Sequence, residues 1–227
     1  MNAAAQATKK FLMELGISDV GFFRLDEQDS LPYGVTLAVQ LSDAVVDEIT
    51  DKPTHSYFHH YRTVNAFLDH CSLRLGLFLQ SNGYRYIPVP ASQSIEGYAG
   101  RFSHKQGACL SGMGTVGRSG LFLHREYGPR VRLATVLTDC DFGAQNHAPV
   151  FLCGNCRLCV TACPATAILG GTWEDVPDRM VLLDPAACSE YMKRHFQGIG
   201  RGAVCGICMK VCPMVKDSTL PKRTNML

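Results

Sequence analysis

The chain of 227 residues lacks the features that mark membrane-spanning, secreted and strongly charged proteins. It has no run of 18 apolar residues, so no transmembrane helix is expected. Lys9 and Lys10 interrupt the apolar character of residues 1–15, which therefore do not resemble a signal peptide. The formal net charge is only +2, which indicates neither a membrane-surface partner nor a nucleic-acid partner.

Cysteine, by contrast, is abundant and unevenly placed. The chain has 11 cysteines, and eight of them lie between residues 153 and 212. Their spacing is C-x2-C-x2-C-x3-C-P in a first run and C-x2-C-x3-C-P in a second run, with one cysteine between the runs. The eight are Cys153, Cys156, Cys159, Cys163, Cys188, Cys205, Cys208 and Cys212.

This spacing is typical of cubane iron–sulfur clusters. A [4Fe–4S] cube needs four thiolates, one for each iron, and two-residue spacers let one loop supply three of them. The fourth cysteine of such a run ligates the other cluster in two-cluster proteins. By that logic one cluster is held by Cys153, Cys156, Cys159 and Cys212. The other is held by Cys163, Cys188, Cys205 and Cys208.

Two other interpretations of the cysteines are disfavoured. Zinc sites show two separated C-x2-C pairs rather than three cysteines in series followed by Cys-Pro. A disulfide framework would need a secreted chain. Two [4Fe–4S] clusters and free thiols instead favour a reducing, cytoplasmic compartment. The isolated Cys71, Cys109 and Cys140 are predicted to be buried as small apolar residues.

The periodicity of the first 142 residues predicts an α+β domain. Helices are expected near residues 4–15, 43–49, 54–82 and 102–110. Strands are expected at residues 20–25, 35–41, 84–89, 120–124 and 131–138. The last two strands are predicted to form a hairpin through residues 126–129. The predicted organisation is then a domain over residues 1–142, a cluster domain over residues 150–213 and a tail over residues 214–227.

A glycine-rich turn follows the helix predicted at residues 102–110. Gly112, Gly114 and Gly117 match G-x-G-x-x-G, but a dinucleotide site needs a strand before that motif and a helix after it. Here the order is reversed, so a Rossmann site is rejected. The glycines could let the backbone approach a flat ligand, or they could make a tight structural turn. Polar residues on either side, Ser103, His104, Lys105 and Arg118, favour a ligand contact.

The chain resembles the epoxyqueuosine reductase family, which is related to the reductive dehalogenases. The resemblance is carried by the glycine turn at 112–117, the strand Leu-Ala-Thr-Val-Leu-Thr-Asp at 133–139 and the cysteine runs that follow. It implies a nitroreductase-like α+β domain that holds a corrinoid, packed on a ferredoxin-like double [4Fe–4S] module. The contacts of the cofactor would then include Gln93, Ser103, Gly112, Gly114, Gly117 and Arg118.

The chain also departs from that family. Residues 90–96 read Pro-Ala-Ser-Gln-Ser-Ile-Glu, without the aspartate that the family carries there as a proposed proton donor. No helical-repeat extension for tRNA follows the cysteine runs. Both departures predict a short branch with another substrate, such as a small molecule, and make nucleic acid a doubtful partner.

Two functional hypotheses follow. In the first, the chain is an oxidoreductase that takes electrons from a donor such as ferredoxin or flavodoxin and passes them to cobalamin. Its proton donors or ligand clamps would be His104 and Lys105, with Tyr98 as a weaker candidate. In the second, the chain is an electron-transfer protein that serves a corrinoid protein or flavoenzyme and has no substrate of its own. FMN in place of the corrinoid stays an alternative within the first hypothesis.

Overall fold

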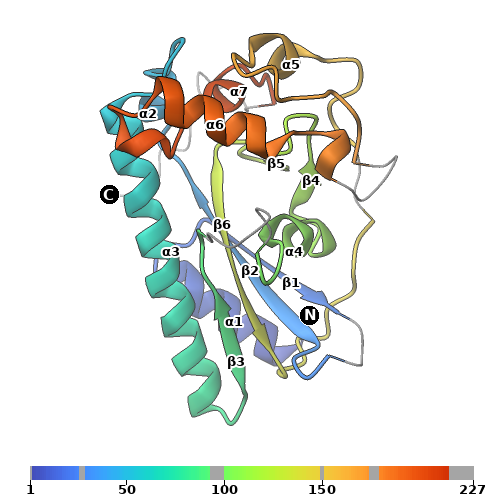
Figure 1. The fold of residues 1–227 in the computed structure, drawn as a ribbon. Helices are drawn as coiled ribbons and strands as arrows, with labels where there is room; N and C mark the ends of the chain where they lie inside the picture. The colour runs from blue at the N-terminus through green and yellow to red at the C-terminus, as the bar shows by residue number, and fades with distance from the viewer. Residues whose placement is uncertain (1, 26–28, 93–99, 149–150, 174–178, 215–227) are drawn as a thin grey trace, which may run out of the picture.

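The computed structural model describes residues 2–25, 29–92, 100–148, 151–173 and 179–214. Its mixed architecture confirms the predicted α+β class (Figure 1). The elements up to residue 142 are α1 (Ala3–Glu14), β1 (Asp19–Arg24), β2 (Tyr33–Gln40), α2 (Asp43–Asp47), α3 (His55–Ser81), β3 (Tyr86–Val89), α4 (His104–Leu110), β4 (Gly114–Val116), β5 (Phe122–His124) and β6 (Val131–Thr138). The later ones are α5 (Leu158–Ala162), η2 (Arg179–Val181), α6 (Pro185–His195), η3 (Gly200–Gly202) and α7 (Ile207–Lys210).

The central sheet has the strand order β1-β2-β6-β3, with every neighbouring pair antiparallel. Strand β2 is the cleanest sequence signal of the four, because its apolar residues alternate and it is buried on both faces. β3 lies at an edge and contains Pro88, which has no N–H to donate to a neighbouring strand.

The hairpin predicted from residues 120–124 and 131–138 is wrong. Strand β5 pairs with β4 in a separate two-stranded sheet, whereas all eight residues of β6 pair with β2. The turn signal itself is real, because His124 and Gly128 form a β-bridge. Which strands pair in a core depends on tertiary packing, however. The long apolar β6 can bury more surface between β2 and β3 than it could beside a three-residue strand.

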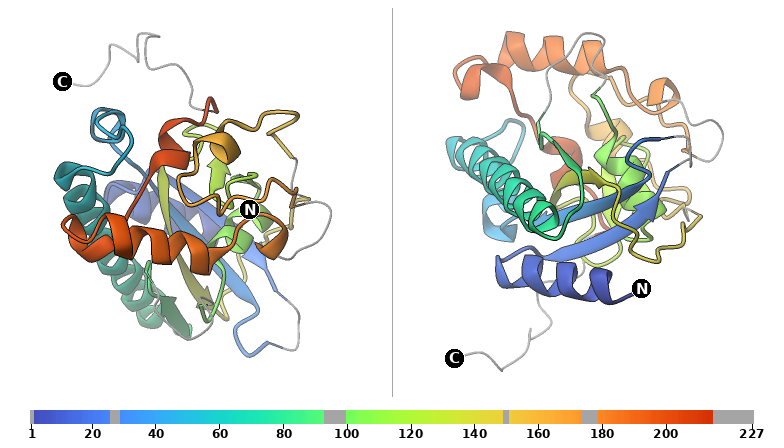
Figure 2. Two further views of the ribbon diagram at one scale, coloured as in Figure 1. Left: turned by 45° about the horizontal axis from the view of Figure 1, so that its top comes forward. Right: turned by 90° about the horizontal axis from the view of Figure 1, so that it is seen from below.

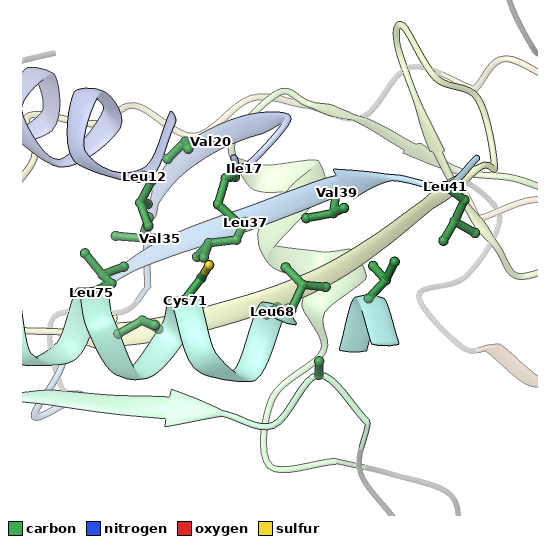
Figure 3. Packing of buried hydrophobic residues seen from close by; sticks show 14 of the residues in the cluster. Leu12, Ile17, Val20, Val35, Leu37, Val39, Leu41, Leu68, Cys71 and Leu75 are labelled. Atoms are coloured by element: carbon green, nitrogen blue, oxygen red, sulfur yellow. The ribbon is translucent and has the colours of Figure 1, made fainter. Parts of the chain in front are cut away.

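Helices α1 and α3 cover one face of the sheet. Helix α3 begins at the cap residue Thr54, whose hydroxyl accepts the backbone N–H of Tyr57, and its apolar stripe faces the strands. Figure 3 shows Leu12 of α1 and Leu68, Cys71 and Leu75 of α3 meeting the side chains of β2. The isolated Cys71, Cys109 and Cys140 are all buried, as predicted.

The opposite face of the sheet is covered by α4 and the β4–β5 pair. Ala108 and Cys109 of α4, Met113 of the following turn and Phe122 of β5 pack with Leu133 of β6. The cysteine-rich helices α5, α6 and α7 gather at one end of the sheet, beyond both layers (Figures 1 and 2). No helix in the described ranges has the length and apolar character needed to cross a membrane.

A charged network holds this end together. Arg130, which immediately precedes β6, is buried and donates hydrogen bonds to the carboxylates of Asp43 and Asp47 in α2. Lys210 of α7 donates to the same Asp47 at 2.7 Å. The network therefore joins the sheet, α2 and the cysteine-rich end of the chain.

Candidate iron–sulfur site

The first predicted set of four cysteines lines one cavity. Cys153 and Cys156 lie in the loop before α5, Cys159 lies on α5, and Cys212 follows α7. All four thiols border this cavity. Burial raises the pKa of the Cys212 thiol, and the nearby Cys153, Cys159 and Cys156 raise it further. Cys212 lies 49 residues after Cys163 in the sequence, yet it borders the same cavity as the three cysteines that precede Cys163.

The second predicted set also comes together. Burial raises the pKa of the Cys188 thiol to about 11, and the neighbouring Cys205 and Cys163 add to the shift. Burial likewise raises the pKa of Cys208, with Cys205 as its strongest thiol neighbour. These residues come from the end of α5, from α6, and from the loop and helix of α7. The structure therefore brings together the two interleaved sets that the spacing predicts.

The donor chemistry of these sets fits [4Fe–4S] clusters. Each set supplies four thiols, and thiolates are the ligands of such cubes. No three His, Cys, Asp or Glu side chains of the described ranges are grouped to hold a single metal ion. A cube instead spreads its four thiolates over four irons. The first cavity also borders a buried donor that lacks a partner within the described chain, the Nε–H of Arg118. A cluster sulfide is a suitable acceptor for it.

Arg118 braces the loop that carries the first set. Its guanidinium donates hydrogen bonds to the backbone oxygens of Gly154 and Gly170, and it lies over the ring of Phe151 at 5.2 Å. Its backbone N–H donates to the sulfur of Cys153 at 3.5 Å. The side chain of Arg118, which the sequence predicts to contact a cofactor, is therefore engaged in hydrogen bonds with the cysteine loop.

The glycine turn is shaped by packing inside the protein. A Cβ on Gly114 would lie 2.0 Å from the carbonyl oxygen of Leu123, across the β4–β5 pair. A Cβ on Gly117 would press on the side chain of Leu123 and lie 3.3 Å from the sulfur of Cys153. Gly112 has a φ of +72° and faces the His147 ring. The alternative of a tight structural turn thus accounts for these glycines, and their contact with a corrinoid stays a prediction.

The two predicted proton donors are also engaged within the protein. The Nε2–H of His104 donates to the carbonyl oxygen of Pro90 at 2.8 Å, since that oxygen can only accept, and its Nδ1 faces the Thr135 hydroxyl at 2.9 Å. Burial lowers the pKa of His104. Lys105 donates to the carbonyl oxygen of Gly120 at 2.6 Å. Ser103 caps α4 by accepting the N–H of Gln106. Gln93 and Tyr98 lie outside the described residues.

One polar group of the central sheet was not anticipated from the sequence. Arg132 of β6 meets Tyr61 and Asn65 of α3, and it shares the surroundings of His104. The sequence does contain a sign of this contact, because Arg132 interrupts the apolar face of β6 that also carries Ala134 and Val136. A charged residue at such a position needs a partner, but the sequence does not say which.

The cysteine-rich end of the chain matches a known protein family. Residues 152–215 match the family model described as a 4Fe-4S double cluster binding domain. The cysteine-rich end of the chain is therefore an iron–sulfur module of the double-cluster type.

The chain is similar in sequence to two kinds of reductase. A tetrachloroethene reductive dehalogenase of Desulfitobacterium hafniense is 27% identical over 161 residues, which cover 64% of this chain and 27% of that protein. An epoxyqueuosine reductase of Lactococcus garvieae is 32% identical over 118 residues, which cover 48% of this chain and 31% of that protein. Both relatives are oxidoreductases, and this chain spans about a quarter to a third of their length.

Solved structures extend the likeness to the whole fold. A catabolic reductive dehalogenase in complex with 3-bromo-4-hydroxybenzoic acid has a TM-score of 0.78 at 19% identity, covering 96% of this chain and 32% of that chain. An epoxyqueuosine reductase has a TM-score of 0.63 at 18% identity, covering 93% of this chain and 65% of that chain. The resemblance to epoxyqueuosine reductases and reductive dehalogenases is thereby confirmed.

Proposed function

We propose that the chain is an iron–sulfur oxidoreductase that passes electrons through two [4Fe–4S] clusters to a bound corrinoid, for the reduction of a small molecule. The observation that carries this proposal is the pair of interleaved cysteine sets, gathered at one end of a reductase-like sheet. Cys153, Cys156, Cys159 and Cys212 would hold one cluster. Cys163, Cys188, Cys205 and Cys208 would hold the other.

The corrinoid part of the proposal rests on the relatives. One dehalogenase of similar fold, with a TM-score of 0.76, is described as suggesting a mechanism for B12-dependent dehalogenation. A corrinoid supplies a strong cobalt nucleophile and reductant when it is bound. A nitroreductase-like N-terminal domain, and an external donor such as ferredoxin or flavodoxin, are parts of the same proposal.

The chain's own residues have separable tasks in this scheme. The thiolates hold the clusters, and Arg118 fixes the loop of the first set and places a positive charge beside it. Such a charge and an N–H···S bond both stabilise the reduced cluster relative to the oxidised one. The polar atoms of His104 and Lys105 are hydrogen-bonded within the protein. We therefore expect these two residues to position neighbouring backbone rather than to transfer protons.

The test is anaerobic purification, quantitation of iron, sulfide and cobalt, and titration with cob(II)alamin followed by EPR. We expect about eight irons per chain, four for each cube. We also expect a stoichiometric complex in which the cobalt signal shifts to a base-off form. Eight irons without any cobalamin binding would overturn the corrinoid proposal and favour the electron-transfer hypothesis. Purification with bound FMN would select the flavin alternative.

A further inference from the structure

Exposed apolar side chains border the first cysteine set. Leu158 and Met214 line the same cavity as its four thiols, and they are 52% and 37% exposed. Leu152, which immediately precedes the first cysteine of the set, is exposed as well. Helix α5, which carries Leu158, lies at the top of the molecule in Figure 1, beyond the end of the sheet. Apolar side chains grouped on a surface in this way commonly mark a site of protein binding.

A second segment extends this apolar surface. Leu169 is 53% exposed and precedes Gly170, whose carbonyl oxygen accepts a hydrogen bond from Arg118. The same guanidinium donates to the carbonyl oxygen of Gly154, in the loop of the first set. Arg118 therefore holds the segment of Leu169 beside that loop. We call the four exposed side chains of this surface, Leu152, Leu158, Leu169 and Met214, the apolar rim.

The apolar rim is accompanied by positive charge. Residues 142–173 and 191–214, which carry all four of its side chains, contain no aspartate and no glutamate. Arg157 immediately precedes α5 and is exposed, and no ion pair among the described residues involves it. A Cβ added to Gly170 would lie 2.6 Å from a guanidinium nitrogen of Arg157, so this cation lies next to Leu169. Such a surface is complementary to a partner that presents apolar side chains and carboxylates.

The second cysteine set faces the interior instead. Cys205 packs against the main hydrophobic core, and the following Gly206 lies against the ring of Tyr57. Burial raises the pKa of Cys208, and Cys159 of the first set is among the thiols that raise it further. The two sets are therefore neighbours, and the first of them is the one that the exposed rim borders.

We propose that the apolar rim and Arg157 form the docking surface for an acidic electron-transfer protein, which reduces the cluster of the first set. In that step the donor loses one electron and the cluster gains it, while no proton moves and no bond forms or breaks. The electron then passes to the neighbouring second set. Transient redox complexes bury less than about 1,200 Å² in total, which suits a surface of this small extent. The role of the docked protein as a donor rests on the proposed function, whereas the binding of an acidic protein here does not.

The first test measures binding of a fluorescently labelled flavodoxin of net negative charge to the anaerobic, cluster-loaded chain without any corrinoid. Leu158→Glu and Leu169→Glu each place a carboxylate in the rim, and each should weaken binding about tenfold or more. Leu77→Glu adds the same charge on α3, at a leucine that is also 52% exposed, and should change the affinity less than about twofold. Raising the salt from about 50 to about 500 mM should weaken binding, and it should do so less in Arg157→Gln.

The second test measures how fast the clusters are reduced in a stopped-flow instrument. Reduction by the reduced flavodoxin should slow in Leu158→Glu and Leu169→Glu, because docking precedes electron transfer. Reduction by dithionite, a small molecule that needs no docking surface, should keep its rate in both variants. Circular dichroism and iron content check that each variant folds and carries its clusters. Leu169 does not border the cavity of the thiols, so Leu169→Glu decides the question if Leu158→Glu loses iron.

Three results would overturn the docking surface. The first is equal weakening in Leu77→Glu, or no binding of the flavodoxin to the unaltered chain. The second is weakened binding in Arg194→Glu, an exposed position of α6, without weakening in either rim variant, because docking would then occur beside the second set. The third is a dimer in solution that Leu158→Glu dissociates, since the rim would then bind a second copy of the chain. Because no corrinoid is present, failure of the cobalamin titration leaves these results intact.

Discussion

At the scale of single residues, three arginines show how the partner decides the role. Arg130 faces two carboxylates and serves as a structural ion pair. Arg118 faces backbone carbonyls and the sulfur of Cys153, so its charge is available to a cluster. Arg132 is oriented by two neutral groups, the side-chain oxygen of Asn65 and the hydroxyl of Tyr61. The sequence alone gives all three the same side chain, and only the contacts distinguish an ion pair, a neighbour of the cysteine loop and a cation held by neutral groups.

Replacing Arg118 should separate its positioning role from simple packing. We expect Arg118→Gln to lower the midpoint potential of one cluster and to make that cluster more labile to oxygen, because a positive charge and its carbonyl contacts are lost. Each charge-assisted bond contributes roughly 1.5–3 kcal/mol. The measurement is an EPR redox titration with iron quantitation. Arg74→Gln, an exposed arginine beside Phe11, is the matched control. Unchanged potentials for both clusters in Arg118→Gln would refute the role.

At the scale of elements, the cysteine-rich end is tied to the sheet through α2. Asp47 of α2 accepts hydrogen bonds from Arg130 and from Lys210 of α7. The hydrogen bonds from Arg130 and Lys210 lower the pKa of Asp47 from 3.8 to about 2. A carboxylate with a depressed pKa in the folded state stabilises that state above its unfolded pKa of 3.8. This stabilisation is lost as the pH falls from 3.8 towards 2.

Asp47→Asn should therefore destabilise the folded chain by a constant amount between pH 5 and pH 8. Because Asp47 is half exposed, solvent screening limits the effect to roughly 0.5–1 kcal/mol. The measurement is denaturant unfolding at several pH values and at low and high salt, where high salt should shrink the difference. Asp51→Asn, which changes an exposed carboxylate that accepts a hydrogen bond from the adjacent Thr50 hydroxyl, serves as the control. A difference that varies across this pH range would point to another titrating group.

The elements also show which parts of the fold were predictable. Helix α3 was expected at residues 54–82 and is found at His55–Ser81, because a long apolar stripe and a capping Thr54 are local signals. The partner of β6 was not predictable in this way. The turn around Gly128 does form a β-bridge with His124. However, β5 pairs with β4, a short strand that lies within the glycine turn. Pairing depends on which surfaces the whole core buries, and no short window of sequence contains that information.

At the scale of the whole molecule, the spacing predicts two interleaved sets of cysteines, since ligand geometry constrains spacing directly. Their surroundings were not predictable. Arg118 and Gly117 belong to a turn about 35 residues before Cys153, and only the tertiary fold places them against its sulfur. The same holds for Arg132, whose companions Tyr61 and Asn65 lie on α3.

Single cysteine variants should test the interleaving. Cys212→Ala and Cys188→Ala should each remove one cluster, leaving about four irons per chain, but a different cluster in each case. EPR spectra of the two reduced variants should therefore differ from each other. Cys140→Ala, which removes a buried thiol outside both sets, should keep about eight irons. Identical residual spectra for Cys212→Ala and Cys188→Ala would contradict the division into two sets.

The interleaving has a consequence for biosynthesis. Cys163, Cys188, Cys205 and Cys208 lie wholly between Cys159 and Cys212 in the sequence. A chain emerging from the ribosome therefore exposes all four ligands of the second set before it exposes the last ligand of the first. An assembly machinery that acts on the growing chain would meet the two sites in that fixed order, the second before the first.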